Sequence, residues 1–140
     1  MSPSVHASAV AVRLNGQWMG VMFRGPSGAG KSDMTMRMMA LGAKLVGDDR
    51  LHIWPDKGGL YARSPDRIAG LLEIRGLGIS AYGYVPCCRI RLAVELQDTP
   101  PERMPEARTT ALCGIDVPHL ALDPRTPSAA TLVMRALEAL

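Results

Sequence analysis

Two apolar runs near the start of the chain predict a pair of strands. Residues 5–12 (VHASAVAV) and residues 18–23 (WMGVMF) are separated by a short polar stretch that contains Asn15-Gly16. Asn-Gly between apolar runs is a strong signal for a tight hairpin turn. The sequence therefore predicts a hairpin whose second strand runs directly into a glycine-rich segment.

Helical spacing of apolar side chains follows that segment. It predicts a helix over residues 31–41, and Gly42 is a natural stop because glycine readily adopts the left-handed conformation that ends helices. The side chains expected near the buried face are Met34, Met38, Met39 and Leu41.

The rest of the chain predicts a mixed α/β fold. Because several hairpins alternate with few helices, the sheet is not expected to be purely parallel. The proline-rich stretch 97–108 is expected to be a loop, and loops of that length are often functional. Further strands are expected at residues 44–47, 51–54, 60–63, 89–96 and 117–122, with a glycine-rich bend at 75–78 and a terminal amphipathic helix at 127–140.

Length and composition suit one domain, residues 1–140, with a hydrophobic core. The net charge of +3 comes from thirteen Arg and three Lys without a basic run, which suits phosphates but is too mild to argue for nucleic acid. The three Cys show no zinc-binding spacing, and their odd number argues against a disulfide framework. No segment approaches membrane-spanning length and the N-terminus is not signal-like, so we expect a soluble cytoplasmic protein without membrane or nucleic-acid partners.

Residues 25–32 (GPSGAGKS) match the phosphate-binding pattern G-x-x-x-x-G-K-[ST] without exception. Glycines let backbone N–H groups turn inward around phosphate oxygens, and the following helix presents its N-terminus to the anion. In this pattern the lysine reaches the β- and γ-phosphates and the hydroxyl can bind Mg²⁺. The strand before it and the helix after it supply the context that the motif requires. The predicted nucleotide-binding residues are Gly25, Pro26, Ser27, Gly28, Ala29, Gly30, Lys31 and Ser32.

Two adjacent carboxylates, Asp48 and Asp49, follow the strand expected at 44–47. A P-loop enzyme needs a carboxylate at the end of a neighbouring strand to hold Mg²⁺ or its water. Two such groups can divide the work, one serving the ion and one accepting a proton from an attacking hydroxyl. The alternative interpretation is a polar turn, since Asp-Asp after a strand is common.

Three further polar residues stand in apolar surroundings. Glu73 and Arg75 are two apart in LLEIRGLGI, so on a strand they would point to the same face. They fit either an Mg²⁺ ligand beside a phosphate-stabilising guanidinium or a structural ion pair. His6 lies in the first strand, and on composition alone a buried imidazole with a satisfied hydrogen bond explains it better than catalysis does.

SVHASAVAV, GPSGAGKSD, LGAKLVGDDR and LLEIRGLGI, in this order and spacing, resemble the C-terminal kinase domain of HPr kinase/phosphorylase. The match is best over residues 4–80. LLEIRGLGI is more diagnostic than the P-loop, because many unrelated enzymes share a P-loop. The resemblance implies the fold shared with phosphoenolpyruvate carboxykinase, a mixed sheet carrying a P-loop. It also implies phosphorylation of a serine of the phosphocarrier protein HPr, with Mg²⁺ and with ATP, or in many members pyrophosphate, as the donor. The reverse reaction removes that phosphate by phosphorolysis.

The resemblance also implies roles for acidic and neutral residues. His6 resembles the family's catalytic histidine, and Asp48 or Asp49 resembles its acid/base residue. Ser32 and Glu73 resemble its magnesium ligands.

Cationic residues are matched in the same way. Lys31 resembles the P-loop lysine, and Arg75 falls in a stretch needed for both directions of the reaction. Arg103, in the proline-rich loop, is the best match for a mobile-loop arginine. Arg125, in LDPRT, falls in a segment tied to dephosphorylation.

The sequence departs from the family pattern at several points. It begins where the kinase domain would begin, so it resembles the short form of some proteobacteria that lacks the N-terminal domain. Pro26 stands where Asp is often found, and Asp33 stands where Glu is. These departures leave the kinase parts intact and bear on the phosphorylase activity and on the hexameric homo-oligomer that the resemblance implies.

Two other functions remain as alternatives. A small-molecule kinase would keep the phosphate loop and the Asp pair, but nothing in this short chain indicates its substrate pocket. A non-catalytic nucleotide sensor or GTPase-like switch would need only binding. A guanine-specific switch usually carries Asn-Lys-x-Asp, which this chain lacks.

Overall fold

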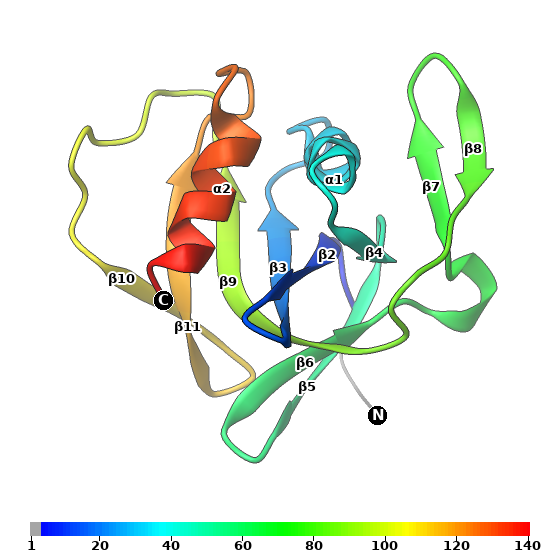
Figure 1. Ribbon diagram of the computed structural model, residues 1–140, viewed down its shortest axis with the longest axis horizontal. Coiled ribbons are helices and arrows are strands. Elements are labelled where there is room, and N and C mark those ends of the chain that lie inside the picture. Colours follow the sequence, from blue (N-terminus) through cyan, green and yellow to red (C-terminus); the bar gives the residue numbers. More distant parts are fainter. Residues whose placement is uncertain (1–3) are drawn as a thin grey trace.

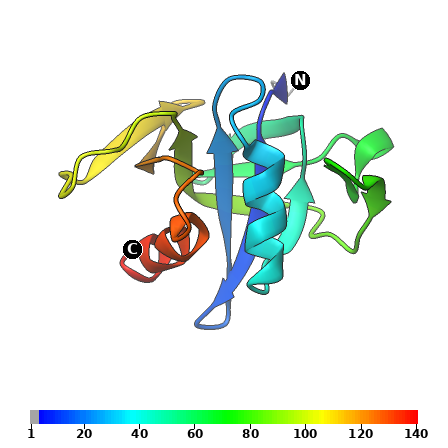
Figure 2. The ribbon, with the colours of Figure 1, turned by 90° about the horizontal axis from the view of Figure 1, so that it is seen from above.

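A computed structural model describes residues 4–140 of the chain. In chain order the elements are β1 (Ser4–Val5), β2 (Ser8–Leu14), β3 (Gln17–Arg24), α1 (Lys31–Ala40), β4 (Lys44–Gly47), β5 (Leu51–Asp56), β6 (Gly59–Arg63), a 3₁₀ turn (Asp66–Ile68), β7 (Leu71–Ile74), β8 (Gly78–Ala81), β9 (Cys88–Leu96), β10 (Arg108–Leu112), β11 (Ile115–Leu122) and α2 (Ala129–Glu138). Both helices lie on one face of a curled sheet, and the ribbon β7–β8 stands beside α1 (Figures 1 and 2). Neither helix in residues 4–140 is long and apolar enough to cross a membrane.

Strand β9 gives the sheet its mixed character. One edge of β9 pairs in parallel with β3, and the other edge pairs antiparallel with β6 and then in parallel with β11. The strand order is β1-β5-β6-β9-β3-β2-β4, with β11 and β10 branching from β9. The expectation of a mixed sheet is therefore confirmed.

The hairpin β2–β3 forms as the Asn-Gly pair predicts. Asn15 and Gly16 have φ values of 50° and 76°, and a tight hairpin turn of this kind needs positive φ at both central positions. The register runs from Leu14 opposite Gln17 to Ser8 opposite Phe23. The hairpin brings the start of β2 beside the end of β3, where the glycine-rich loop begins.

Apolar side chains cover both faces of the sheet. On the helix face, Phe23 packs in one cluster with Met34 and Met38 of α1 and Val133 of α2. Together these contacts anchor the helix that follows the glycine-rich loop. The opposite face is filled by side chains that include Ala9, Met22, Leu51, Leu60 and Ile90.

A small cluster anchors the ribbon β7–β8 to the rest of the molecule. Leu72 and Ile74 of β7 are buried against Leu45 of β4. The alternate residues Leu71 and Glu73 are exposed, as the two-residue period of a strand requires. The ribbon therefore holds Glu73 at a fixed place next to α1.

The structure corrects two local expectations and adds two short strands that were not expected. The run 5–12 is not one strand, because it breaks at His6 and Ala7 and β1 pairs with β5 instead. Leu41 is 50% exposed because α1 ends at Ala40 and the chain is already turning away. The bend at 75–78 leads into a second ribbon strand, β8, and the proline-rich loop is followed by the short edge strand β10.

Candidate active site

The glycine-rich loop joins β3 to α1, the position expected for it. A Cβ at Gly25 would lie 3.0 Å from the Cβ of Ala29 and 3.2 Å from the carbonyl oxygen of Leu96, so the loop approaches β9 closely. Gly30 is the N-cap of α1 and has a φ of 103°, which favours glycine. The first N–H groups of an α-helix have no acceptor within the helix, so the start of α1 offers donors to an anion.

Lys31 places its ammonium group inside this loop. The residue is only 7% exposed, and its Nζ donates to the carbonyl oxygens of Gly25 and Pro26 at 2.8 and 2.9 Å. The loop thus curls around a positive charge, which is the electrostatic environment that a phosphate needs.

Asp48 is buried directly beneath the start of α1. It is 6% exposed, and its Oδ1 accepts hydrogen bonds from the hydroxyls of Ser32, at 2.8 Å, and Ser8, at 2.7 Å. The first of these bonds links the loop to the end of β4, as the sequence predicts for a carboxylate that serves the same ion as the loop serine.

Asp49 faces in a different direction and contacts His6. The imidazole Nε2 lies 2.9 Å from the Asp49 Oδ1, and the two side chains are 43% and 67% exposed. An ionised Asp49 carboxylate can only accept in this contact, with the imidazole as the donor. The two neighbouring carboxylates therefore have different partners, one buried with two hydroxyls and the other open to solvent beside a histidine.

One cleft of about 460 Å³ gathers most of these residues. Asp48 is not among its lining residues and is joined to it through its hydrogen bond with Ser32. Of the predicted catalytic and metal-binding residues, six line it: His6, Lys31, Ser32, Asp49, Glu73 and Arg75. Of the remaining predicted loop residues, Ser27, Gly28 and Gly30 also line it. Arg75 follows β7 rather than lying on it, so the expectation that both Glu73 and Arg75 belong to a strand is wrong, although both reach the same cleft.

A second hollow of about 400 Å³ lies further along α1, between the C-terminal part of that helix, β4 and the ribbon. Met36, Met39, Leu45, Leu72 and Tyr82 contribute to its lining, and it contains none of the predicted site residues. The chemistry belongs to the first cleft because the ionisable groups gather there.

Oxygen donors in the cleft fit a hard cation. The Ser32 hydroxyl, the Glu73 carboxylate and the Asp pair supply the ligand type that Mg²⁺ prefers. Within residues 4–140, no three His, Cys, Asp or Glu side chains are already grouped to hold a metal. A sparse protein ligand set suits Mg²⁺, which usually keeps several waters and takes phosphate oxygens.

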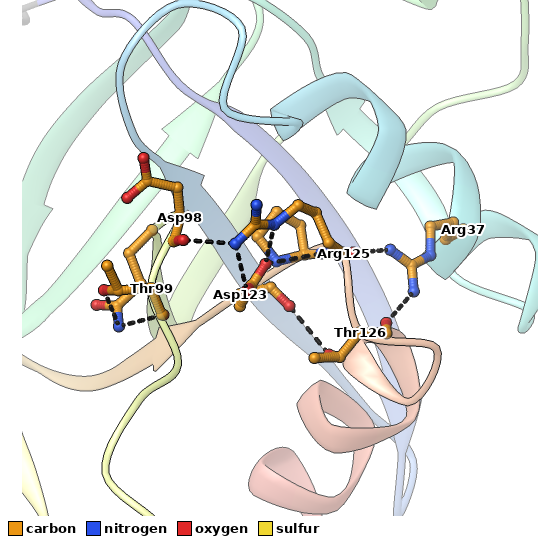
Figure 3. Close-up of polar contacts among 8 residues, drawn as sticks. Arg37, Asp98, Thr99, Asp123, Arg125 and Thr126 are labelled. Carbon is orange, nitrogen blue, oxygen red and sulfur yellow. Dashed lines mark hydrogen bonds and ion pairs between the residues drawn. The ribbon is translucent and has the colours of Figure 1, made fainter.

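Arg103 and Arg125 are not brought to the cleft. Arg103 is exposed on the loop between β9 and β10, which Figure 1 shows near α2, away from the ribbon. The Arg125 guanidinium donates to both carboxylate oxygens of Asp123 and to the carbonyl of Asp98 (Figure 3). These hydrogen bonds from Arg125 hold the pKa of Asp123 below its ordinary value.

The same region is joined to α1 by Arg37. Its guanidinium donates to the carbonyl oxygens of Pro124 and Thr126, at 2.6 and 3.1 Å (Figure 3). A Cβ at Gly30 would lie 3.4 Å from the Pro124 ring. The turn between β11 and α2 therefore supports the helix that carries the loop, without lining the cleft.

Ser8 is the residue of this site that sequence reasoning missed. It stands in an apolar strand, where a lone serine gives no signal. Only the spatial meeting of β2 with the end of β4 reveals its contact with the Asp pair.

Comparisons with known proteins identify relatives of this chain. A family model described as the HPr Serine kinase C-terminal domain matches residues 1–136. The HPr kinase/phosphorylase of Geobacillus thermodenitrificans is 32% identical, over 89% of this chain and 44% of that protein. The HPr kinase/phosphorylase of Limosilactobacillus reuteri is 30% identical, over 90% of this chain and 43% of that protein. The chain thus spans less than half the length of these curated relatives.

A solved structure shows the same fold. The Hpr(Ser) kinase/phosphatase from Coxiella burnetii superposes with a TM-score of 0.77 at 23% identity, covering 98% of this chain and 95% of that one. The fold expected from the sequence resemblance is confirmed.

Proposed function

Since the chain belongs to the HPr serine kinase C-terminal domain family, we propose that it transfers the γ-phosphoryl group of ATP to a serine of an HPr-type phosphocarrier protein. The observation that carries the proposal is the cleft itself, where Lys31 and Ser32 of the loop meet Asp49 and His6, with Asp48 hydrogen-bonded to Ser32. The names of the relatives, HPr kinase/phosphorylase, support the choice of substrate.

Lys31 and the start of α1 would hold the phosphates. The Lys31 ammonium is bonded to two neutral carbonyl oxygens, and phosphate oxygens would be stronger acceptors because they are charged. As the reaction proceeds, charge moves onto the β-phosphate, and a fixed ammonium at that place stabilises the transition state.

The Asp48–Asp49 pair would take the proton. As the serine oxygen bonds to the γ-phosphorus, the hydroxyl proton passes to a carboxylate, and the bond from phosphorus to the bridging oxygen breaks towards ADP. His6 holds Asp49 by its Nε2 contact, so it would keep that carboxylate in place beside the reacting serine.

The same groups would serve the reverse reaction. When inorganic phosphate attacks phosphoserine, the protonated carboxylate returns its proton to the departing serine oxygen, and pyrophosphate leaves. Because the steps are the same in opposite order, pyrophosphate would also act as a phosphoryl donor. One carboxylate is therefore expected to matter in both directions.

Ser32, with Glu73 or one of the Asp pair, would hold Mg²⁺. The ion, when bound, neutralises charge on the phosphates. We expect EDTA to abolish transfer and added Mg²⁺ to restore it, since the available ligands are hard oxygens.

The proposal is tested by Asp48→Asn and Asp49→Asn, with Asp56→Asn at the exposed end of β5 as a control. Each variant should fold and bind ATP, and at least one of the first two should lose on the order of 100-fold in transfer rate. Wild-type rates in both would contradict the acid/base role. If the wild-type chain binds ATP tightly but never phosphorylates an HPr-type protein, the nucleotide-sensor alternative is favoured.

A further inference from the structure

Ser8 lies two residues after His6, just past the break that separates β1 from the β2–β3 hairpin. It is the first residue of β2 and is completely buried, with 0% of its surface exposed. A buried hydroxyl is costly unless its hydrogen-bonding capacity is used. Ser8 also borders the cleft, so the partners of this hydroxyl bear on the reacting groups.

The Ser8 hydroxyl bonds to both members of the Asp pair. It donates to the Asp48 Oδ1 at 2.7 Å and accepts from the backbone N–H of Asp49 at 3.3 Å. One small side chain therefore fixes a carboxylate orientation at Asp48 and a backbone position at Asp49.

At Asp48, Ser8 and Ser32 share one oxygen. Both hydroxyls donate to Oδ1, and no described residue donates to Oδ2. No fully buried polar side-chain atom within residues 4–140 lacks a hydrogen-bond partner, so Oδ2 is accessible to solvent. The two hydroxyls thus hold the carboxylate with one oxygen towards the loop serine and one oxygen free.

At Asp49, the backbone adopts a conformation that needs support. Its φ is 71°, which residues with a Cβ seldom adopt. The ladder between β2 and β4 shifts register between Ala9 and Val10 and ends at the pairing of Ala9 with Gly47. The Ser8 hydroxyl supplies the acceptor that the ladder no longer provides, which keeps Asp49 turned towards His6.

We propose that Ser8 is a positioning residue for phosphoryl transfer, whose single hydroxyl holds Asp48 on the loop serine and Asp49 on His6. This inference rests on the function proposed above. If the hydroxyl only satisfied hydrogen bonds in the core, replacing Ser8 would change the stability of the fold alone. Replacing a positioning serine also lowers the rate at saturating substrate.

The kinetic test compares Ser8→Ala with Ser8→Thr and with Ser64→Ala. Ser64 is a matched control because it is also a buried serine, and its hydroxyl donates to the carbonyl of Pro65 rather than to the Asp pair. We expect Ser8→Ala to lower kcat on the order of tenfold, because a hydrogen bond to a charged group is lost, with the KM for ATP changed less than about threefold. Ser8→Thr should recover most of the rate, and Ser64→Ala should keep it. Wild-type kcat in folded Ser8→Ala, or an equal loss in Ser64→Ala, would overturn the proposal.

A second measurement does not depend on activity. By NMR, the Asp49 amide proton should exchange with solvent faster in Ser8→Ala than in the wild type, while the core amides of β3 keep their protection. Unchanged exchange at the Asp49 amide would overturn the proposal even if kcat fell in Ser8→Ala. If the wild-type chain transfers no phosphate, the proposed function fails, yet this measurement still decides whether Ser8 holds Asp49.

Discussion

Lys31 keeps its ammonium group in a place that is almost closed to water. Only 7% of the residue is exposed, and two backbone carbonyl oxygens accept its hydrogen bonds. The motif alone predicts this lysine, because the spacing G-x-x-x-x-G-K-S has one chemical purpose. Ser8 shows the opposite case, since its role comes from a contact between residues that are far apart in the chain.

We expect Lys31→Ala to reduce phosphoryl transfer on the order of 100-fold or more, because a positive charge is lost where negative charge develops. Lys57→Ala, in the β5–β6 turn, is the control and should leave the rate unchanged. Single-turnover measurements with saturating ATP would show the difference. Near-normal turnover by Lys31→Ala would contradict the assignment of the phosphate loop.

The cysteines lead to a second prediction at this scale. Burial raises the pKa of Cys88 to about 11, with a smaller contribution from the neighbouring Cys87. Because the thiolate is the reactive form, Cys88 should resist iodoacetamide at pH 8, whereas the exposed Cys113 should react first. Peptide mapping by mass spectrometry would check this order, and labelling of Cys88 as fast as Cys113 in the folded protein would refute it.

At the scale of elements, the sequence predicted the turns and helices that depend on a few neighbouring residues. The Asn15-Gly16 turn, the loop and α1 were all visible because turn residues and helical spacing act over a few positions. β10 and β8 were not visible. Both are short, and each exists because a neighbouring strand is available, β11 for one and β7 for the other.

The turn between β11 and α2 gives a prediction about pH. Asp123 has a pKa below its ordinary value because Arg125 donates to it through side chain and backbone. A depressed folded-state pKa adds stability that is present above the unfolded-state pKa, about 3.9 for Asp, and is lost as pH falls through the folded value.

Asp123→Asn should therefore lower the free energy of unfolding at pH 7 and reduce its dependence on pH below 4. Urea unfolding at pH 7 and at pH 3 would measure both effects. Asp116→Asn, on the exposed side of β11, serves as the control. An identical loss of stability on acidification in the Asp123→Asn variant and the wild type would show that this pair does not contribute.

At the scale of the whole molecule, the strand order could not be predicted from the sequence. The mixed character followed from the hairpins, but β9 pairs with three strands that are remote in sequence, β3, β6 and β11. Pairing of β2 with β3 and with β4, together with packing of β7 against Leu45, brings the end of β4, the start of β2 and the ribbon β7–β8 close to α1. Six of the predicted catalytic and metal-binding residues line one cleft, while the distances among them depend on long-range pairing.

Assembly is also a property of the whole molecule. The resemblance implies a homo-oligomer, and the exposed side chains of Leu77 and Ile79, 80% and 71% exposed on the ribbon, are the kind of apolar surface that such contacts use. The hexamer stays a prediction that light scattering can test.

Transfer of phosphate from a nucleotide to a protein serine in this cleft can be measured directly. The chain is incubated with an HPr-type phosphocarrier protein, ATP labelled in the γ-phosphate and Mg²⁺, and the label is then located by mass spectrometry. We predict one phosphate on a serine of the phosphocarrier protein, absent when Lys31→Ala replaces the wild type. Tight ATP binding without any label on the phosphocarrier protein would show that the chain is not its kinase.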